Sequence, residues 1–293
     1  MDQALLVFIT VVERGNFTRS AEELHMTQPA VSQYIQSLER AMGARLLDRT
    51  NKYVKLTRAG QIVYEHAVQM KGLYLKMHNL VDDLLHNAGG ELTIGASYTY
   101  GEYILPHVIA RLRTAYPLVK PRITIGNTRD IAAAVLHSHL EIGVVEGELQ
   151  HEKLIVEPFA EDSMYIIVSG SHKWAGQGVI PAEEAAKEIW ILREPGSGTR
   201  AAADKLFARL GFTPKETMEF GSTQIIKESV EAGLGITLLS SSAVRKEVSL
   251  GTLAMLQIPG APVSRKFSWI MQNTEFRTRA AEVFIELLEP GIG

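Results

Sequence analysis

The chain has 293 residues, with 30 Lys and Arg against 33 Asp and Glu, a hydrophobic fraction of 46% and no Cys. This length predicts about two domains, and the composition excludes disordered, collagen-like and disulfide-scaffold proteins. The lack of Cys excludes Cys-ligated zinc, iron–sulfur clusters and thiol catalysis, and the net charge of −3 argues against uniform coating of nucleic acid.

The charge is unevenly distributed along the chain. Residues 1–60 carry eight Lys and Arg and six Asp and Glu, which leaves 30 − 8 = 22 against 33 − 6 = 27 for the remainder. The basic residues concentrate between Arg40 and Arg58, where Asp48 is the one acid. Such a run is often only a solvated face, so its meaning depends on the elements around it.

Residues 1–26 predict two short helices. An apolar stripe at helical spacing comprises Leu5, Phe8, Ile9 and Val12. Gly15-Asn16 ends this helix, and we expect Thr18 to cap the next one.

A third helix is predicted over Gln28–Arg40, with Thr27 as its cap and Pro29 in its first turn, where a missing N–H costs little. Its buried positions are Val31, Ile35 and Leu38, which leaves Gln28, Ser32, Gln33 and Gln36 outside. Two short helices joined by a tight turn, the second with an uncharged polar face, are typical of a helix-turn-helix. A helical hairpin that binds a protein partner is the alternative.

Two short strands around Asn51-Lys52 are predicted next, as a wing. Amide and hydroxyl side chains of the third helix can hydrogen-bond base edges in the major groove, whereas Arg49 and Lys52 suit phosphates. The pattern therefore favours DNA as the partner of this segment.

The run Asn16–Leu24, with Thr27-Gln28-Pro29-Ala30-Val31-Ser32 and Leu56-Thr57-Arg58-Ala59-Gly60, resembles the winged-helix signature of LysR-type transcriptional regulators. The resemblance implies a sequence-specific regulator that binds double-stranded promoter DNA, assembles as a homodimer and commonly as a tetramer, and can contact RNA polymerase. Its predicted DNA-binding residues are Thr27, Gln28, Pro29, Ser32, Gln33, Gln36, Arg49 and Lys52.

Residues 57–88 predict one long linker helix. Its apolar seam steps by four and three residues through Val63, Ala67, Met70, Tyr74, Met77, Val81 and Leu84. An unbroken seam over three heptads favours a two-helix coiled coil and hence a dimer. A surface helix docked on its own domain is the alternative.

The remaining residues, 89–293, predict an α/β fold, because strands alternate with helices. The expected elements include strands at 91–95, 122–125, 142–145, 164–168, 189–192 and 235–239, and helices at 103–115, 130–139, 182–187, 199–210 and 225–232. The resemblance implies an effector-binding domain similar to type 2 periplasmic binding proteins, with lobe I at about 89–161 and 267–293 and lobe II at about 162–266. The chain would cross between the lobes near Ala160–Asp162 and Val263–Lys266.

Three strand-to-helix turns are rich in hydroxyl groups, and in such sheets ligands bind beyond the carboxyl ends of the strands. Helix N-termini at these turns favour anions, although helix capping explains each turn equally well. With the resemblance, they predict a small, anionic metabolite between the lobes, held by Ser97, Thr99, Tyr100, Thr128, Ser197, Thr199 and Arg200.

An enzyme is the less favoured reading. Gly196–Ala201 fits the pattern G-x-G-x-x-A, with Glu216 near the position of a ribose-binding acid, which is the signal of an NAD(P)-dependent oxidoreductase. The pattern lies in the middle of the chain and lacks a second mononucleotide-binding half. No metal site or cofactor is expected, since His137 and His139 lie on different faces of a helix. A cytoplasmic location is expected because Met1-Asp2-Gln3 lacks the basic start of a signal peptide; this, with the N-terminal helices, also disfavours a solute-binding protein.

Overall fold

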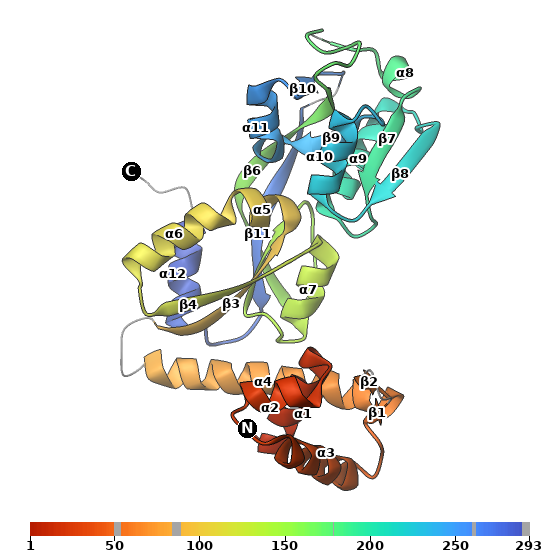
Figure 1. Ribbon diagram of the computed structural model, residues 1–293. Helices are drawn as coiled ribbons and strands as arrows, with labels where there is room; N and C mark the ends of the chain where they lie inside the picture. Colours follow the sequence, from red (N-terminus) through yellow and green to blue (C-terminus); the bar gives the residue numbers. More distant parts are fainter. Residues whose placement is uncertain (50–53, 84–88, 178, 260–261, 289–293) are drawn as a thin grey trace. The chain divides into compact units, whose positions relative to one another are not determined.

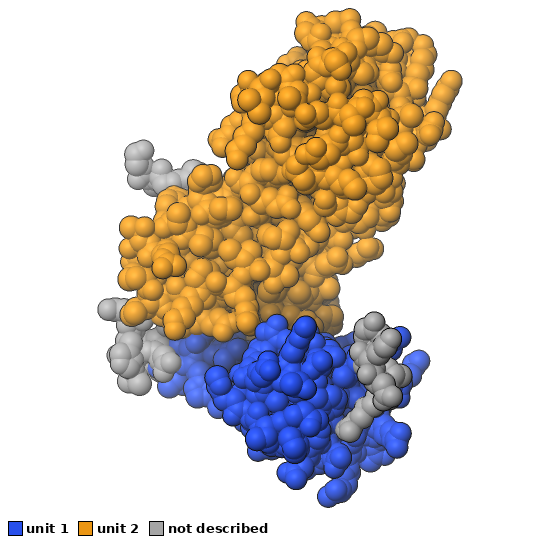
Figure 2. All heavy atoms as spheres, viewed as in Figure 1, with its two compact units in different colours: residues 1–81 blue, residues 82–293 orange. Residues whose placement is uncertain are grey.

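The computed structural model describes residues 1–49, 54–83, 89–177, 179–259 and 262–288. It comprises two compact units, Met1–Val81 and Asp82–Gly293, which Figure 2 shows in blue and orange. Among the described residues, no helix is long and apolar enough to cross a membrane.

The N-terminal unit begins with α1 (Gln3–Arg14), α2 (Phe17–Glu23) and α3 (Gln28–Met42). The side chain of Asn16 accepts hydrogen bonds from the backbone N–H groups of Thr18 and Arg19, so Asn16 is the cap of α2 and the prediction of Thr18 was wrong. Thr27 caps α3 as expected, by accepting a hydrogen bond from the N–H of Ala30.

A small apolar core holds these helices together, and its central side chains come from α1 and α3. Phe8, Val31 and Ile35 are fully buried. Burial of one such side chain stabilises the fold by about 1.5–3 kcal/mol, which explains how short helices with few internal turns stay folded.

The wing consists of β1 (Leu47–Arg49), which pairs antiparallel with β2 (Val54–Leu56). The carboxylate of Glu39 on α3 accepts hydrogen bonds from the N–H groups of Leu46 and Leu47, at 2.9 and 3.2 Å. This contact fixes the start of the wing relative to α3. The predicted turn at Asn51-Lys52 lies outside the described residues.

The linker helix is α4 (Arg58–Asp83), capped by Thr57. The predicted seam divides along the helix: Ala67 is fully buried and Val63 packs on the core of its own unit, whereas four later positions are exposed. These four are Met70, Tyr74, Met77 and Val81. Leu84 lies outside the described residues.

In the C-terminal unit, lobe I is built on β3 (Gly90–Ser97), β4 (Val119–Gly126) and β5 (Ile142–Glu146), with β3 parallel to both neighbours. One face of this sheet carries α6 (Leu105–Ala115) and α12 (Arg279–Leu288), and the other carries α7 (Thr128–Leu136) (Figure 1). A short helix, α5 (Tyr98–Tyr103), follows β3 directly. The helix expected at 103–115 corresponds to α6, which begins two residues later with Pro106 in its first turn, whereas α5 was not predicted.

Lobe II contains β7 (Ile189–Arg193) parallel to β8 (Glu216–Phe220), with β9 (Thr237–Ser240) and β10 (Leu253–Leu256). Its helices are α8 (Ala182–Ala185), α9 (Gly198–Leu210), α10 (Thr223–Glu231) and α11 (Ser241–Leu250). The strands β8 and β10 are short and half-exposed, so neither was predicted from an apolar run.

Two long strands, β6 (Leu154–Ser169) and β11 (Val263–Gln272), pass through both lobes as an antiparallel pair. Their partners in register include Glu161 with Lys266 and Asp162 with Arg265. One end of the pair joins the sheet of lobe I through β5, and the other joins β9 and β10 of lobe II. The lobes are thus connected by one hydrogen-bonded ladder.

Gly60, in the first turn of α4, allows this helix to start close to the wing. A Cβ atom at this position would lie 1.9 Å from the carbonyl oxygen of Leu46, a backbone atom that cannot rotate away. We predict that Gly60→Ala lowers the free energy of unfolding by about 1–3 kcal/mol, measured by urea unfolding followed by circular dichroism. Gly221→Ala is the matched control, since no atom lies within 4 Å of its Cβ position. Equal stability of the two variants would contradict the close packing at Gly60.

Candidate DNA-binding face and sensor crevice

The polar face of α3 is accessible. Thr27, Gln28, Pro29, Gln33 and Gln36 are exposed and Ser32 is half-buried, because Val31, Ile35 and Leu38 point into the core. The amide of Gln28 donates a hydrogen bond to the hydroxyl of Ser32 at 3.0 Å. The structure therefore brings together six of the eight predicted DNA-binding residues on and beside one helix.

The N-terminal unit also has exposed basic side chains. Arg40, Arg45, Lys55 and Arg58 are exposed. The side chain of Arg49 and the whole of Lys52 lie outside the described residues. Arg14 instead pairs with Glu23, which links α1 to α2.

In the C-terminal unit, six of the seven predicted ligand-binding residues are buried at the junction of the lobes. The hydroxyl groups of Ser97 and Thr128 are hydrogen-bonded at 3.0 Å, and Ser197 accepts a bond from the N–H of Thr199. Arg200 is partly exposed and pairs with Asp204 and Glu219 of its own lobe. The predicted turns therefore converge, but their polar groups bond to the protein itself.

A buried ion-pair cluster, which we call the Arg265 cluster, occupies the centre of this junction. It consists of Arg265, Glu146 and Asp162, whose side chains are 3%, 2% and 2% exposed. The guanidinium of Arg265 donates from Nη1 to Glu146 at 2.7 Å and from Nε to Asp162 at 2.8 Å. It also donates to the hydroxyl groups of Thr199 and Thr99, at 3.1 and 3.0 Å. These partners come from both lobes.

The two carboxylates of the cluster have further donors. Glu146 Oε1 accepts hydrogen bonds from the N–H groups of Thr99 and Tyr100, and Asp162 accepts one from the hydroxyl of Ser240 at 2.6 Å. Burial raises the pKa of Asp162 above its ordinary value, and the charge of Arg265 opposes this rise. A buried charge pair of this kind needs such a complete set of hydrogen bonds to offset its loss of hydration.

Sequence reasoning missed the Arg265 cluster, although one signal was present. The expected crossing segments contain Asp162 and Arg265, and both occupy inward positions in strands whose neighbours alternate between exposed and buried. A charged residue at an inward strand position requires a partner of opposite charge, since an unpaired buried charge is very costly.

A second set of polar contacts joins the lobes near β7. The guanidinium of Arg193 is buried and lies 4.2 Å from the ring centre of Tyr98. Glu194 accepts from Arg193 and from the amide of Asn127. Burial would raise the pKa of Glu194, but these hydrogen bonds and the charge of Arg193 hold it below its ordinary value.

The glycines of the G-x-G pattern serve the contact between the lobes. Gly196 has a φ of +99°, and a Cβ there would lie 2.8 Å from the guanidinium of Arg129. A Cβ at Gly198 would lie 2.4 Å from the carbonyl oxygen of Glu146. Each glycine thus allows the start of α9 to lie close to lobe I. This close contact explains the G-x-G pattern without dinucleotide binding.

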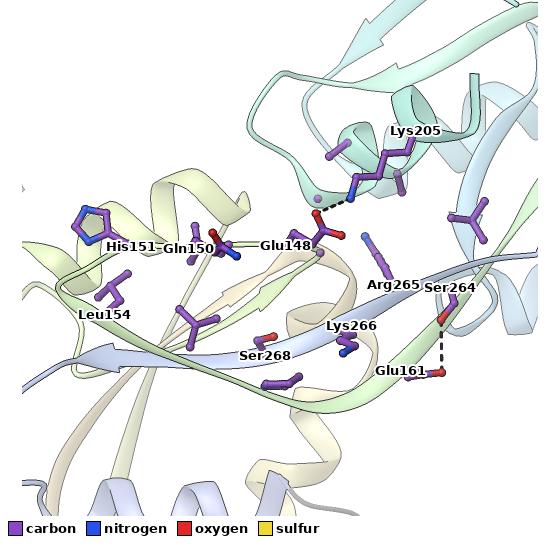
Figure 3. A pocket seen from close by; sticks show the side chains of 18 residues that line it. Glu148, Gln150, His151, Leu154, Glu161, Lys205, Ser264, Arg265, Lys266 and Ser268 are labelled. Atoms are coloured by element: carbon purple, nitrogen blue, oxygen red, sulfur yellow. Dashed lines mark hydrogen bonds and ion pairs between the residues drawn. The ribbon is translucent and has the colours of Figure 1, made fainter. Parts of the chain in front are cut away.

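A pocket of about 940 Å³ adjoins the Arg265 cluster between the lobes (Figure 3). Its walls are the segment from Gly147 to Leu154 of lobe I, the first turns of α9 in lobe II, and β6 and β11. Arg265 lines the pocket, whereas none of the seven predicted ligand-binding residues does.

Polar and charged side chains of this pocket include Lys205, Lys266, Gln150, His151, Ser264 and Glu161. Lys205 pairs with Glu148 at 2.9 Å across the lobes, and this hydrogen bond lowers the pKa of Glu148. Among the described residues, Lys266 has no ion pair within 4.0 Å. The described part of the chain also contains no group of three or more His, Asp or Glu side chains that could hold a metal ion.

Comparisons with known proteins agree with this architecture. Residues 3–61 match the model of the bacterial regulatory helix-turn-helix proteins of the lysR family, and residues 86–291 match the LysR substrate binding domain. The HTH-type transcriptional regulator CysL of Bacillus subtilis is 38% identical over 97% of this chain and 95% of its own length.

Two solved structures are also similar. Full-length CbnR, complexed with the target DNA, has a TM-score of 0.74 at 22% identity and covers 98% of this chain and 99% of its own. The regulatory domain of CcmR from Synechocystis PCC6803, in complex with 2-PG, has a TM-score of 0.61 at 25% identity and covers 68% of this chain and 95% of its own.

A winged helix-turn-helix joined by a long helix to a two-lobed α/β unit defines a class of DNA-binding transcription regulators with an effector-binding domain. Within this class, the chain belongs to the LysR family. The family consists of regulators rather than enzymes, so the oxidoreductase considered from the sequence is set aside.

The Arg265 cluster gives a prediction about stability and pH. Arg265→Met leaves two buried carboxylates without their cation and should lower the free energy of unfolding by about 3–5 kcal/mol. Loss of the guanidinium should raise the pKa of Asp162 further, because it removes the charge that opposes the effect of burial. A raised pKa in the folded state means that stability is lost as the pH rises, so the defect should be larger at pH 7 than at pH 5.

Urea unfolding at both pH values measures this effect. Arg279→Met is the control, since Arg279 is half-exposed and pairs with Glu282 on the surface. If Arg265→Met lowers the free energy of unfolding equally at both pH values, the predicted rise in the pKa of Asp162 is wrong.

Proposed function

We propose that this chain is a sequence-specific regulator of promoter DNA that acts as a homodimer and responds to a small, anionic molecule held between its lobes. The observation that carries the proposal is the exposed polar face of α3 in a chain of the LysR family. Gln28, Ser32, Gln33 and Gln36 offer amide and hydroxyl groups of the kind that read base edges in the major groove. The DNA complex of the similar regulator CbnR also supports DNA as the partner.

Dimerisation through α4 is supported by its exposed apolar side chains. Met70, Leu73, Tyr74, Met77 and Val81 are 40–54% exposed in the single chain. A helix with this seam is stabilised when a second helix covers it. Two α3 helices would then reach half-sites about one turn of DNA apart or a multiple of it.

An effector between the lobes is supported by the pocket beside the Arg265 cluster. Its walls come from both lobes, so a bound molecule would interact differently with different arrangements of the lobes and shift their populations. Lys266 and Lys205 line it and favour an anion. The similar regulatory domain of CcmR holds 2-PG, which supports a small ligand in this kind of domain.

The role of α3 predicts a loss of sequence discrimination in Gln33→Ala. DNA enriched from a random library by the full chain supplies the specific ligand, and a shuffled duplex supplies the nonspecific one. Gln33→Ala should weaken binding to the enriched DNA by about 1–3 kcal/mol in fluorescence anisotropy, with a smaller effect on the shuffled duplex. Gln61→Ala, the same change at an exposed site on α4, should alter neither. Equal losses of affinity for both duplexes would show that Gln33 does not read base edges.

The role of the pocket predicts an anion response that depends on Lys266. Small carboxylates, inorganic phosphate and sulfate are added one at a time to the full chain at constant ionic strength. At least one should raise the Tm with a saturating dependence on concentration, and Lys266→Gln should raise its apparent Kd about tenfold, equivalent to about 1.4 kcal/mol. Lys215→Gln, at an exposed lysine that does not line the pocket, is the control. A response that survives Lys266→Gln unchanged would place the anion elsewhere.

A further inference from the structure

Glu146 is the last residue of β5, and its carboxylate accepts hydrogen bonds from donors in two distant segments of the chain. Oε1 accepts from the N–H groups of Thr99 and Tyr100, at 2.7 and 3.2 Å. Oε2 accepts from the guanidinium of Arg265 at 2.7 Å. Every one of these contacts is buried.

These donors are the groups with which proteins bind free carboxylates. Backbone N–H groups and a guanidinium both form strong hydrogen bonds with an ionised oxygen, and a buried position strengthens them. The donors lie between the lobes, and Thr99 and Tyr100 are two of the residues predicted to hold an anionic effector. Here the chain itself supplies the anion.

We propose that the crevice contains a binding site for a small carboxylate, and that the side chain of Glu146 fills it as an internal ligand. The inference goes beyond the proposed function, because it holds whether or not the adjoining pocket binds an effector. In this proposal the carboxylate of Glu146 occupies the position that an external anion would take. The adjoining pocket stays open to a molecule from solution.

Two neighbouring glycines make this arrangement possible. Gly147, directly after Glu146, has a φ of +85°, which lets the chain turn away immediately after the carboxylate is placed. Gly198 brings α9 against Glu146, since a Cβ there would lie 2.7 Å from the Cβ of Glu146. Gly147, Gly198 and Arg265 also line the pocket, so the site has a route to solvent on that side.

The site can be emptied without leaving Arg265 unpaired. Glu146→Ala removes the side-chain atoms beyond Cβ, which correspond to one acetate ion. In this variant Arg265 keeps its bond to Asp162 at 2.8 Å and to Thr199. The N–H groups of Thr99 and Tyr100 lose their acceptor, and the vacated volume connects to them.

The test measures the Tm of the full chain in acetate at constant ionic strength. Acetate should stabilise Glu146→Ala with a saturating dependence on concentration and should leave the wild type unchanged. At about five times its Kd, acetate should raise the Tm of the variant by about 2–4 °C. Acetamide, which has the same shape without the charge, should have no effect.

Two further variants separate this site from other anion binding. Glu146→Gln fills the same space and should not respond to acetate. Glu161→Ala removes an exposed acid that lines the pocket without contacting the Arg265 cluster, and it should not respond either. If Glu146→Ala folds poorly, acetate present during refolding from urea should raise the yield of folded protein.

A rise in Tm that is equal in the wild type, Glu146→Gln and Glu146→Ala would overturn the proposal, as would the absence of any acetate effect on the stability and refolding of Glu146→Ala. An anion response of the wild type that requires Lys266 is a separate result, because it concerns the proposed effector in the pocket. The two ideas can therefore fail independently.

Discussion

The buried charge of Arg265 constrains how the two lobes of the C-terminal unit meet. A guanidinium that is 3% exposed must find acceptors for its N–H groups inside the protein, and it finds them in both lobes. Thr99 and Glu146 come from lobe I, and Thr199 from lobe II. The lobes therefore meet in an arrangement that satisfies one cation, and any other arrangement has to provide it with different partners.

The N-terminal unit could be predicted closely because its signals are local. Helical spacing identified α1 and α3, and Thr27 and Gly43 mark the two ends of α3. The one misplaced cap is instructive. Asn16 and Thr18 can both cap a helix, and only the backbone conformation, extended at Asn16, distinguishes them. The exposed glutamines of α3 were found because their apolar neighbours fix which face is buried.

The sensor site was less accessible from the sequence, for a physical reason. Its hydroxyl-rich turns have local signatures, but the charge that organises them does not. Arg265 lies 103 residues from Asp162 and 119 from Glu146, and only the pairing of β11 with β6 on one side and with β5 on the other brings them together. The alternation of exposed and buried positions in β11 indicates that Arg265 points inward, but no local sequence pattern identifies its partners. From the sequence, only the turns of this site could be predicted. The structure shows in addition that the carboxylate of Glu146 lies among them.

The paired course of β6 and β11 through both lobes also limits how the sensor can move. Because these strands are hydrogen-bonded to each other in register across the crossing, neither can slide along the other without breaking the ladder. Separation of the lobes along the strands is thus resisted, while twisting or bending of a two-stranded ribbon costs few hydrogen bonds. A molecule in the pocket beside this ribbon would therefore affect the angle between the lobes more than their separation along the strands.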